Sequence, residues 1–288
     1  MVKVPGSCGE LAQGMLENNN ILITCPISWY SKVEIEFCRP NVAEEKKNCK
    51  SYQAVELLLR RHKMQREFSL HINSQLPRGK GMASSSADIA ASLVAAAKAL
   101  SLELFADDIK EIALSIEPTD GIFLSGITAF DHISGSICDN LGVPPLMKIA
   151  IFDFGGEVDT LAFNKRQDLH ELRRKKKDQF TEAYNLVKEG IFRSNPVLIA
   201  KGATISALAN QIILNKPSLE KIILIGNSCG ALGVNVAHSG TVAGVLFDSN
   251  IMEAFDSCVA KIVSDCGTLQ YLGSADLISG GIFEEGKS

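Results

Sequence analysis

The chain has 288 residues, of which 46% are hydrophobic and 22% charged, and its formal net charge is −4. This composition is typical of a globular protein with a large buried core, and it argues against an intrinsically disordered chain. A slightly acidic chain also lacks the concentrated basic face that nucleic-acid binding requires. We therefore exclude nucleic acid as the principal partner.

The first residues, MVKVPGSCGE, predict a strand and a loop, with none of the charged start and apolar segment of a secretory signal. The longest apolar stretch is interrupted by Lys98 and is rich in alanine and serine, so we expect no membrane span. The eight cysteines are scattered, without a C-x-x-C pair or histidines at zinc spacing. We therefore expect reduced thiols and a cytoplasmic protein.

The first half of the chain alternates β-rich runs with helical patterns. Alternating β-branched residues indicate strands, and apolar residues at three- and four-residue spacing indicate helices. Strands are predicted at residues 20–29, 31–38 and 67–74, and helices at residues 51–63, 84–100 and 106–116.

The pattern changes near residues 141–146, where Pro144 and Pro145 interrupt it. A basic run at residues 173–177 falls within an amphipathic pattern, which predicts a solvated helix face and leaves a polyanion-binding patch as the alternative. Strands are then predicted at residues 146–154, 221–226, 241–248 and 268–272, and helices at residues 177–190, 196–211 and 250–266. Without strict strand–helix alternation, the predicted class is α+β, in two domains at residues 1–145 and 146–288.

A glycine-rich turn leads directly into the helix that begins at Ser84. Gly79 and Gly81 can leave backbone amides uncovered, and a helix start attracts anions through free amides and its dipole. Three consecutive serines, residues 84–86, exceed what one helix cap requires. An ordinary loop with an N-cap remains the alternative, because the P-loop pattern is absent and the dinucleotide pattern G-x-G-x-x-G is matched only in part.

The window PRGKGMASSSAD resembles the second motif of the GHMP kinases, P-x-x-x-G-L-G-S-S-A, a family named for galactokinase, homoserine kinase, mevalonate kinase and phosphomevalonate kinase. Met82 stands for leucine, and Ala83 and Ser86 depart from the pattern. The resemblance implies a loop around the phosphates of ATP, with Ser85 as a ligand of Mg²⁺. The implied ATP-binding residues are Pro77, Arg78, Gly79, Lys80, Gly81, Met82, Ala83, Ser84, Ser85 and Ser86.

Two further stretches carry the resemblance. KVPGSCGELAQG, residues 3–14, is similar to the family's N-terminal motif A-P-G-K-x-x-L-x-G-E-H, although Ser7 stands where many members have a basic residue. NVAHSGTVAGVLFD resembles the third motif, for which a simple hairpin turn is the alternative. Together with EPTDG, these stretches are similar to the L-threonine kinases of the propanediol-utilisation type, which make threonine phosphate for the side arm of cobalamin. The implied substrate-binding residues are Ser7, Cys8, Gly9, Glu10, Asp131, His132, Ser239, Gly240 and Thr241.

Two carboxylates flank the break at Pro118, and an aspartate before glycine is often only a turn former. By resemblance, Glu117 becomes a second Mg²⁺ ligand and Asp120 the catalytic residue that aligns or accepts the proton of the substrate hydroxyl. An amino-acid substrate also needs partners for its charges. We expect Glu10 and Asp131 near its ammonium, and loop amides or His132 near its carboxylate.

The resemblance therefore implies an ATP- and Mg²⁺-dependent kinase of L-threonine. Its fold would pair an N-terminal ribosomal-protein-S5-like domain with a C-terminal ferredoxin-like domain. Homoserine kinase and a non-catalytic nucleotide or metabolite sensor are the alternatives, whereas a mevalonate-type decarboxylase is disfavoured because its basic complement is missing. The expected partners are ATP and L-threonine, without nucleic acid or membrane, and a homodimer is left open.

Overall fold

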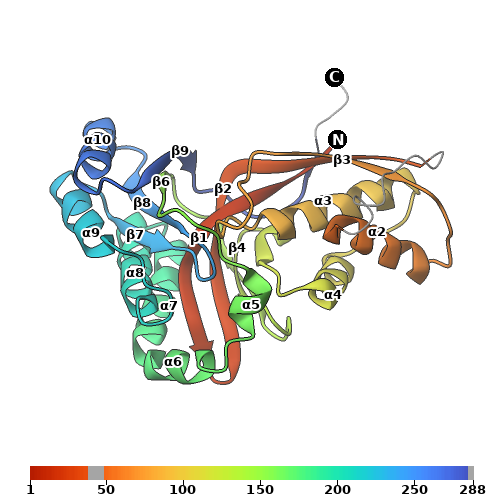
Figure 1. Cartoon of the computed structure of the whole chain (residues 1–288), viewed down its shortest axis with the longest axis horizontal. Helices are drawn as coiled ribbons and strands as arrows, with labels where there is room; N and C mark the ends of the chain where they lie inside the picture. The colour runs from red at the N-terminus through yellow and green to blue at the C-terminus, as the bar shows by residue number, and fades with distance from the viewer. Residues whose placement is uncertain (38–48, 285–288) are drawn as a thin grey trace.

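The computed structural model describes residues 1–37 and 49–284, so Cys38 and the end of the strand predicted at residues 31–38 lie outside the described residues. Within these residues, the strands form one antiparallel sheet of ten, in the order β5-β4-β2-β1-β7-β8-β6-β9, with β3 added to β2 and β10 to β1 (Figure 1). The strands are β1 Val2–Leu16, β2 Asn19–Glu36, β3 Ser69–Ser74, β4 Ile127–Asp131, β5 Cys138–Gly142, β6 Met147–Asp153, β7 Gly233–Val236, β8 Val242–Asp248, β9 Gln270–Asp276 and β10 Phe283–Glu284.

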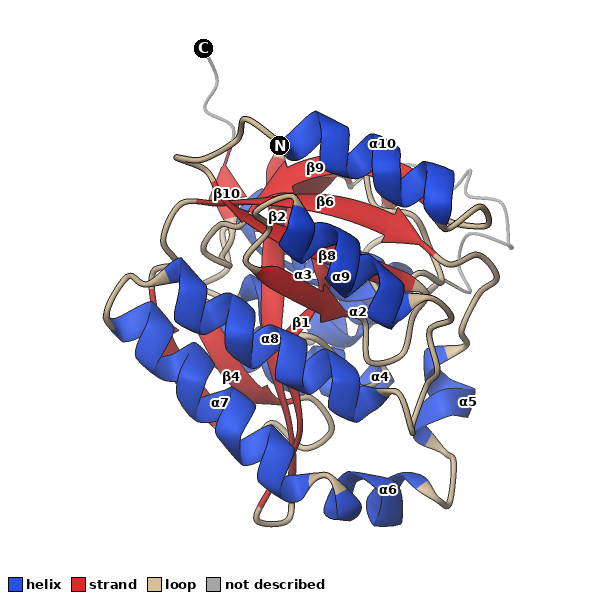
Figure 2. Ribbon diagram, turned by 90° about the vertical axis from the view of Figure 1, so that its left-hand side faces the viewer, coloured by secondary structure: helices blue, strands red, loops and turns tan. Residues whose placement is uncertain are grey.

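Helices pack against the sheet at both ends of the molecule. The α2, α3 and α4 helices lie at one end of the molecule, and α7 to α10 lie at the other (Figures 1 and 2). The helical segments are α2 Lys50–Arg61, α3 Ser84–Ala99, α4 Ala106–Ile116, the 3₁₀ turn η1 Gly121–Phe123, α5 Thr160–Asn164, α6 Leu169–Lys175, α7 Lys177–Phe192, α8 Pro196–Asn210, α9 Leu219–Ser228 and α10 Phe255–Asp265. Among the described residues, no helix is both long and apolar enough to cross a membrane.

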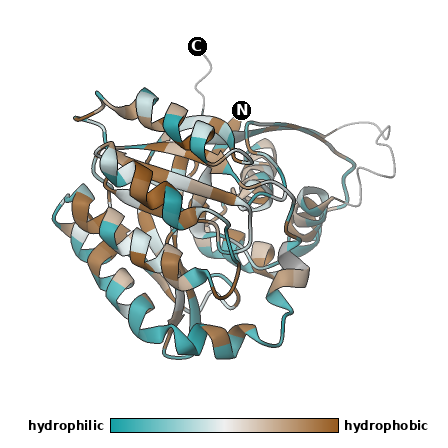
Figure 3. Ribbon diagram, turned by 60° about the vertical axis from the view of Figure 1, so that its left-hand side comes forward, coloured by the Kyte–Doolittle hydropathy of each residue, from teal (hydrophilic) through white to brown (hydrophobic). Residues whose placement is uncertain are grey.

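The long strand β1 joins the two parts of the molecule. It pairs with β2 along most of its length and reaches β7 through the register pair Glu10 and Val236. One hydrophobic cluster lies under α2 to α4, a second lies around β1, α7 and α8, and a third lies under α9 and α10. Hydrophobic residues accordingly gather on the inward sides of the elements (Figure 3). The predicted α+β class is confirmed, while the division at residues 145 and 146 stays a prediction.

The predicted strand at residues 221–226 is wrong, because these residues form most of helix α9. Short apolar runs fit a strand and a buried helix equally well, and the helix buries Leu219, Ile222 and Ile225 on one side. The basic run is also not wholly a solvated face. Helix α6 ends at Lys175 and α7 begins at Lys177, and this break leaves Arg173 buried, only 8% exposed.

Helix α3 is packed closely against β1 and β2, because its alanines allow the helix to approach the sheet. The turn that precedes it meets a second turn, between β7 and β8, at the glycine pair Gly81 and Gly240. A Cβ atom on residue 240 would lie 2.3 Å from the Cα atom of Gly81 and 2.3 Å from the carbonyl oxygen of Lys80. This contact between two parts of the chain far apart in sequence fixes the position of the glycine-rich turn.

We predict that Gly240→Ala lowers the free energy of unfolding by about 1–3 kcal/mol, because the added methyl group overpacks this contact. Gly267→Ala is the matched control, since a Cβ atom there meets no other atom within 4 Å. Urea denaturation of both variants measures the difference. If Gly240→Ala is as stable as the wild type, the two turns are not packed as closely as the structure indicates.

Candidate active site

A cleft with an open volume of about 580 Å³ lies where the glycine-rich turn, the start of α3, the loop after α4 and strand β1 meet. Its walls come from five separate stretches of sequence, which the sheet brings together. The lining residues are Glu10, Gly79, Gly81, Met82, Ala83, Ser84, Ser85, Ser86, Glu117, Pro118, Asp120, His132, His238 and Ser239.

The backbone of the glycine-rich turn is shaped to expose amides. Gly79, Gly81 and Ala83 all have positive φ, at +70°, +79° and 55°. Ala83 is also the N-cap residue of α3, and no side chain of the described residues caps this helix start. Free amides at a helix N-terminus, with the positive end of the helix dipole, form a binding site for a phosphate group.

The three serines at this helix start have different partners. Ser85 donates its hydroxyl proton to a carboxylate oxygen of Glu117. Ser86 Oγ accepts a hydrogen bond of 3.1 Å from the backbone amide of Asp120, and Ser84 lines the cleft. Two of the serines therefore fix the acidic loop against the helix start, which explains why the hydroxyls outnumber the needs of a cap.

Glu117 is a buried carboxylate that is held by a cation. Its second carboxylate oxygen accepts a hydrogen bond from the ammonium of Lys50, and its side chain is only 3% exposed. A buried carboxylate requires such compensation. The hydroxyl of Ser85 and the carboxylate of Glu117 are both oxygen donors of the kind that Mg²⁺ prefers, so these two residues fit a magnesium ion.

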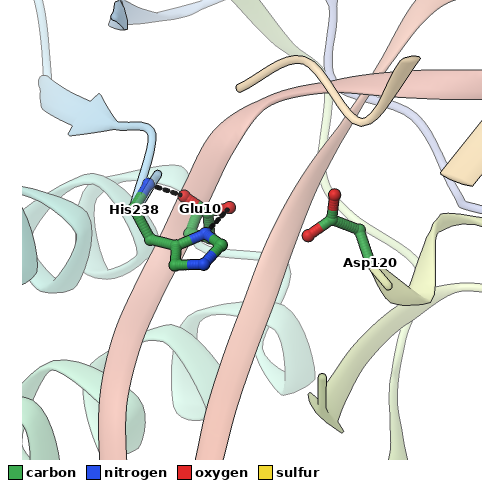
Figure 4. A group of neighbouring side chains, drawn as sticks. All are labelled: Glu10, Asp120 and His238. Carbon is green, nitrogen blue, oxygen red and sulfur yellow. Dashed lines mark hydrogen bonds and ion pairs between the residues drawn. The ribbon is translucent and has the colours of Figure 1, made fainter. Parts of the chain in front are cut away.

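Glu10, His238 and Asp120 form a second group of polar side chains in the lining of the cleft (Figure 4). Glu10 accepts a hydrogen bond from the backbone amide of His238, at 2.7 Å, and its other carboxylate oxygen lies 3.3 Å from Nδ1 of the same residue. One ligand atom each of Glu10, His238 and Asp120 lies within 4.8 Å of the other two. Because this group includes an imidazole and Mg²⁺ prefers oxygen ligands, it suits magnesium less well than Ser85 and Glu117 do.

Two carboxyls of the cleft, those of Asp120 and Glu10, have raised pKa values. Burial, followed by the charges of Glu10 and Glu117, raises the pKa of Asp120 well above its usual range. Burial also raises the pKa of Glu10, although the amide of His238 and the ammonium of Lys216 oppose the shift. The cleft therefore has a deficit of positive charge, which a bound cationic group would correct.

A bridge from the glycine-rich turn to strand β6 holds the turn in place. The ammonium of Lys80 lies 2.8 Å from Asp153 Oδ2 and donates to the carbonyl oxygen of Gly156 at 2.6 Å. The hydroxyl of Thr241 donates to Asp153 at 2.5 Å, and its amide donates to the carbonyl oxygen of Lys80 at 2.9 Å. Lys80 and Thr241 thus brace the turn and do not line the cleft.

The N-terminal motif contributes one lining residue, Glu10. The amide of Ser7 donates to the carbonyl oxygen of Met82 at 3.0 Å, so it supports the glycine-rich turn and is not free for a substrate. Cys8 is fully buried, and burial, followed by the nearby Glu10, raises the pKa of its thiol far above the usual range. Gly9 has a φ of +57°, and a Cβ atom there would lie 2.4 Å from the amide nitrogen of Ala237. These three residues shape the wall from behind.

The remaining predicted residues divide into two groups. His132 lines the cleft, and its Nδ1 atom lies 2.9 Å from the carbonyl oxygen of Asn20. Asp131 does not line the cleft, because its carboxylate accepts hydrogen bonds from its own turn, including 2.5 Å from the hydroxyl of Ser134. Arg78 is exposed at the cleft's outer edge, 3.5 Å from Asp88, while Pro77 lies outside the lining.

Four residues of the site were not predicted from the sequence. Lys50 and Lys216 are isolated lysines without a local pattern, and their roles depend on contacts with distant residues, Glu117 and Glu10. Asp153 ends a strand, and only the fold brings it to Lys80. His238 could have been found, because it lies within the stretch AHSG that carries the third motif.

The site combines a glycine-rich turn, an uncapped helix start and several carboxylates. An enzyme that transfers a phosphoryl group to a small molecule needs these features. The family described as GHMP kinases N terminal domain matches residues 50–127. An L-threonine kinase of Salmonella typhimurium is 34% identical to this chain, over 86% of the chain and 83% of the relative. The chain belongs to the GHMP kinase family, and it is a small-molecule kinase that uses ATP.

Other similar proteins agree with this assignment. An L-threonine kinase of Citrobacter freundii is 32% identical, over 87% of this chain and 87% of the relative. Among solved structures, homoserine kinase of Cytophaga hutchinsonii superposes with a TM-score of 0.73 at 14% identity, covering 98% of this chain and 96% of that one. Mevalonate kinase of L. major, in complex with R-mevalonate, gives 0.70 at 14% identity, covering 97% and 96%. At such identities, the two structures support the fold alone.

We predict that Asp120→Asn raises the free energy of unfolding of the metal-free protein relative to the wild type, and that this gain is larger at pH 8 than at pH 5. The folded-state pKa of Asp120 is raised, so its contribution to stability is present below its unfolded pKa and is lost as the pH rises through the folded value. The relative gain should be on the order of 1 kcal/mol, or about 2–4 °C in Tm. Thermal unfolding in EDTA at both pH values measures it.

The exposed variant Asp139→Asn serves as the control, and it should follow the wild type at both pH values. If Asp120→Asn shows the same dependence of stability on pH as the wild type, the pKa of Asp120 is not raised in the folded protein.

Proposed function

We propose that this protein is an L-threonine kinase, which transfers the γ-phosphoryl group of ATP to the side-chain hydroxyl of L-threonine and forms O-phospho-L-threonine and ADP. The observation that carries the proposal is that two acidic side chains, Glu10 and Asp120, line the same cleft as the amide-rich start of α3. These acidic side chains suit a substrate with an ammonium group near its hydroxyl. The sequence similarity to two L-threonine kinases supports the same choice.

In this proposal, the turn at residues 79–83 and the first amides of α3 bind the phosphates. Asp120 lines the same cleft and orients the attacking hydroxyl or accepts its proton, a role to which a raised pKa is suited. Glu10 binds the ammonium group of the substrate. Lys80, Thr241 and Ser7 keep the turn in place without contacting the reacting atoms.

Magnesium would be held by Ser85 and Glu117. When bound, it neutralises charge on the transferred phosphoryl group and its neighbours. The ammonium of Lys50 contacts one carboxylate oxygen of Glu117, and Ser85 contacts the other. We further propose that the product serves the side arm of cobalamin, as the resemblance to the propanediol-utilisation kinases implies.

Homoserine kinase is the alternative within the same class. Homoserine is an isomer of threonine with the same charged groups, and its hydroxyl lies on the terminal carbon, one carbon further from the carbon that carries the ammonium. The structural similarity to a homoserine kinase makes this a necessary comparison. A protein that binds ATP and transfers nothing would instead be a sensor.

We predict that a coupled assay of ADP release gives the highest kcat/KM with L-threonine, lower values with serine and homoserine, and no turnover with mevalonate, which lacks an ammonium group. Asp120→Asn should lower kcat by about 10²–10⁴-fold, because a positioned acid–base group contributes that much, while nucleotide affinity stays nearly unchanged. A preference for homoserine would select the alternative. Nucleotide binding without turnover of any hydroxy amino acid would select the sensor.

We also predict that Ser85→Ala raises the Mg²⁺ concentration for half-maximal activity by about tenfold, the scale of about 1.4 kcal/mol for one lost ligand interaction. The KM for threonine should change less, because Ser85 faces Glu117 and not Glu10. Ser115→Ala, on the exposed side of α4, is the control and should match the wild type. The opposite pattern, with threonine affinity lost and magnesium dependence intact, would contradict the metal assignment.

A further inference from the structure

A larger and more open pocket adjoins the cleft, with an open volume of about 1460 Å³. We call it the outer pocket. The two spaces share four lining residues from the glycine-rich turn, the start of α3 and the end of α4, namely Gly79, Ser84, Ser85 and Glu117. An anion bound at the helix start is therefore within reach of side chains that line the outer pocket. Its other lining residues are Cys49, Lys50, Ser51, Arg78, Asp88, Glu157, Val158 and Asp159.

The cleft itself offers no lysine or arginine to a polyphosphate. Within residues 1–37 and 49–284, the side chains that line it include none of either type. Lys80 of the glycine-rich turn is bound to Asp153 and to the carbonyl oxygen of Gly156. Enzymes that transfer a phosphoryl group use fixed cations, besides Mg²⁺, to neutralise the transferred group. We therefore expect such a cation on a surface next to the cleft.

Lys50 lies at such a surface. It is the first residue of α2, and its ammonium contacts Oε2 of Glu117, whose Oε1 accepts the hydroxyl of Ser85. A single carboxylate thus separates the ammonium from the first turn of α3. The side chain of Lys50 is 38% exposed, whereas that of Glu117 is 3% exposed. The lysine can therefore change its partner through its flexible four-carbon stem, while the buried glutamate is fixed.

The other charges of the outer pocket favour Lys50 as its phosphate ligand. Arg78 is more exposed, with 78% of its side chain in solvent, and it lies 3.5 Å from Oδ2 of Asp88. An exposed cation interacts weakly with an anion, because water and salt screen the charges. The carboxylates of Asp88, Glu157 and Asp159 line the same pocket, so a phosphate that enters it needs a cation close to the helix start.

We propose that Lys50 is a phosphate-binding residue, which turns from Glu117 to the terminal phosphates of ATP when the nucleotide and Mg²⁺ bind. A metal ion at Ser85 and Glu117 repels the neighbouring ammonium, and the phosphates at the helix start attract it. Lys50 therefore compensates Glu117 in the empty protein and the nucleotide in the loaded one. The inference rests on the proposed function and deepens it, because it names the protein cation that contacts the transferred group.

The test measures ligand binding to Lys50→Met by isothermal titration calorimetry, without threonine and so without turnover. With Mg²⁺ at saturation, the Kd of ATP should rise by about 10- to 100-fold, the scale of a lost charge-assisted hydrogen bond. The Kd of adenosine, which has no phosphate, should change by less than about twofold. Without nucleotide, the Kd of Mg²⁺ should fall by about three- to tenfold, because the ammonium no longer competes for Glu117.

Lys63→Met is the matched control, because Lys63 lies just beyond the end of the same helix and is exposed. All three of its Kd values should equal those of the wild type. Lys50→Arg should lie between Lys50→Met and the wild type for ATP, because it keeps the charge. If Lys50→Met does not fold, as judged by circular dichroism, Lys50→Gln keeps a hydrogen-bond donor for Glu117 and should shift the Kd values of ATP and Mg²⁺ in the same directions.

An unchanged Kd of ATP, or an equal loss of affinity for adenosine, would overturn the phosphate assignment and leave the kinase proposal standing. Weaker binding of Mg²⁺ alone would also overturn the inference, since Lys50 would then support Glu117 in the metal-bound state. A wild-type protein that binds ATP and phosphorylates no hydroxy amino acid would overturn the proposed function and not the role of Lys50, because the binding measurements omit that substrate. A wild-type protein that binds no ATP would overturn both.

Discussion

Two hydrogen bonds from the first turn of α3 hold the acidic loop after α4, and the geometry of the cleft depends on them. Ser86 accepts the amide of Asp120, and Ser85 donates to Glu117. The same turn of helix presents the free amides that suit a phosphate. Because one rigid element fixes both groups, the distance between the phosphate site and the carboxylates is set by helix geometry and not by a flexible loop.

The charges of the cleft follow from that arrangement. Glu10, Glu117 and Asp120 lie around one confined space, and within residues 1–37 and 49–284 the compensating cations are Lys50, at Glu117, and Lys216, near Glu10. Such a concentration of buried negative charge is unfavourable in the empty protein and favourable once a metal ion and an ammonium group are bound. The binding of cationic groups is therefore stronger, because it removes an unfavourable interaction that is present in the empty protein.

The sequence predicted the elements that carry strong local signals. Helix α4 begins and ends as predicted at residues 106 and 116, because its acidic first turn and the proline at position 118 mark both ends. The cleft-lining turn at residues 79–86 was found for the same reason, since positive φ and free amides require glycine and small residues locally. Strands β4, β5 and β7 were missed. They are short, and their identity comes from pairing with distant strands, which no local pattern records.

The same distinction accounts for the burial of Arg173. Within the sequence, Arg173 is one member of a run of five basic residues, and such runs normally lie in water. It is buried because α6 stops at Lys175 and α7 starts in a new direction, which turns this one side chain toward Asn20 and the two histidines. The neighbouring Arg174 stays in solvent. A single helix break thus separates an exposed arginine from a buried one, and only the three-dimensional arrangement distinguishes the two.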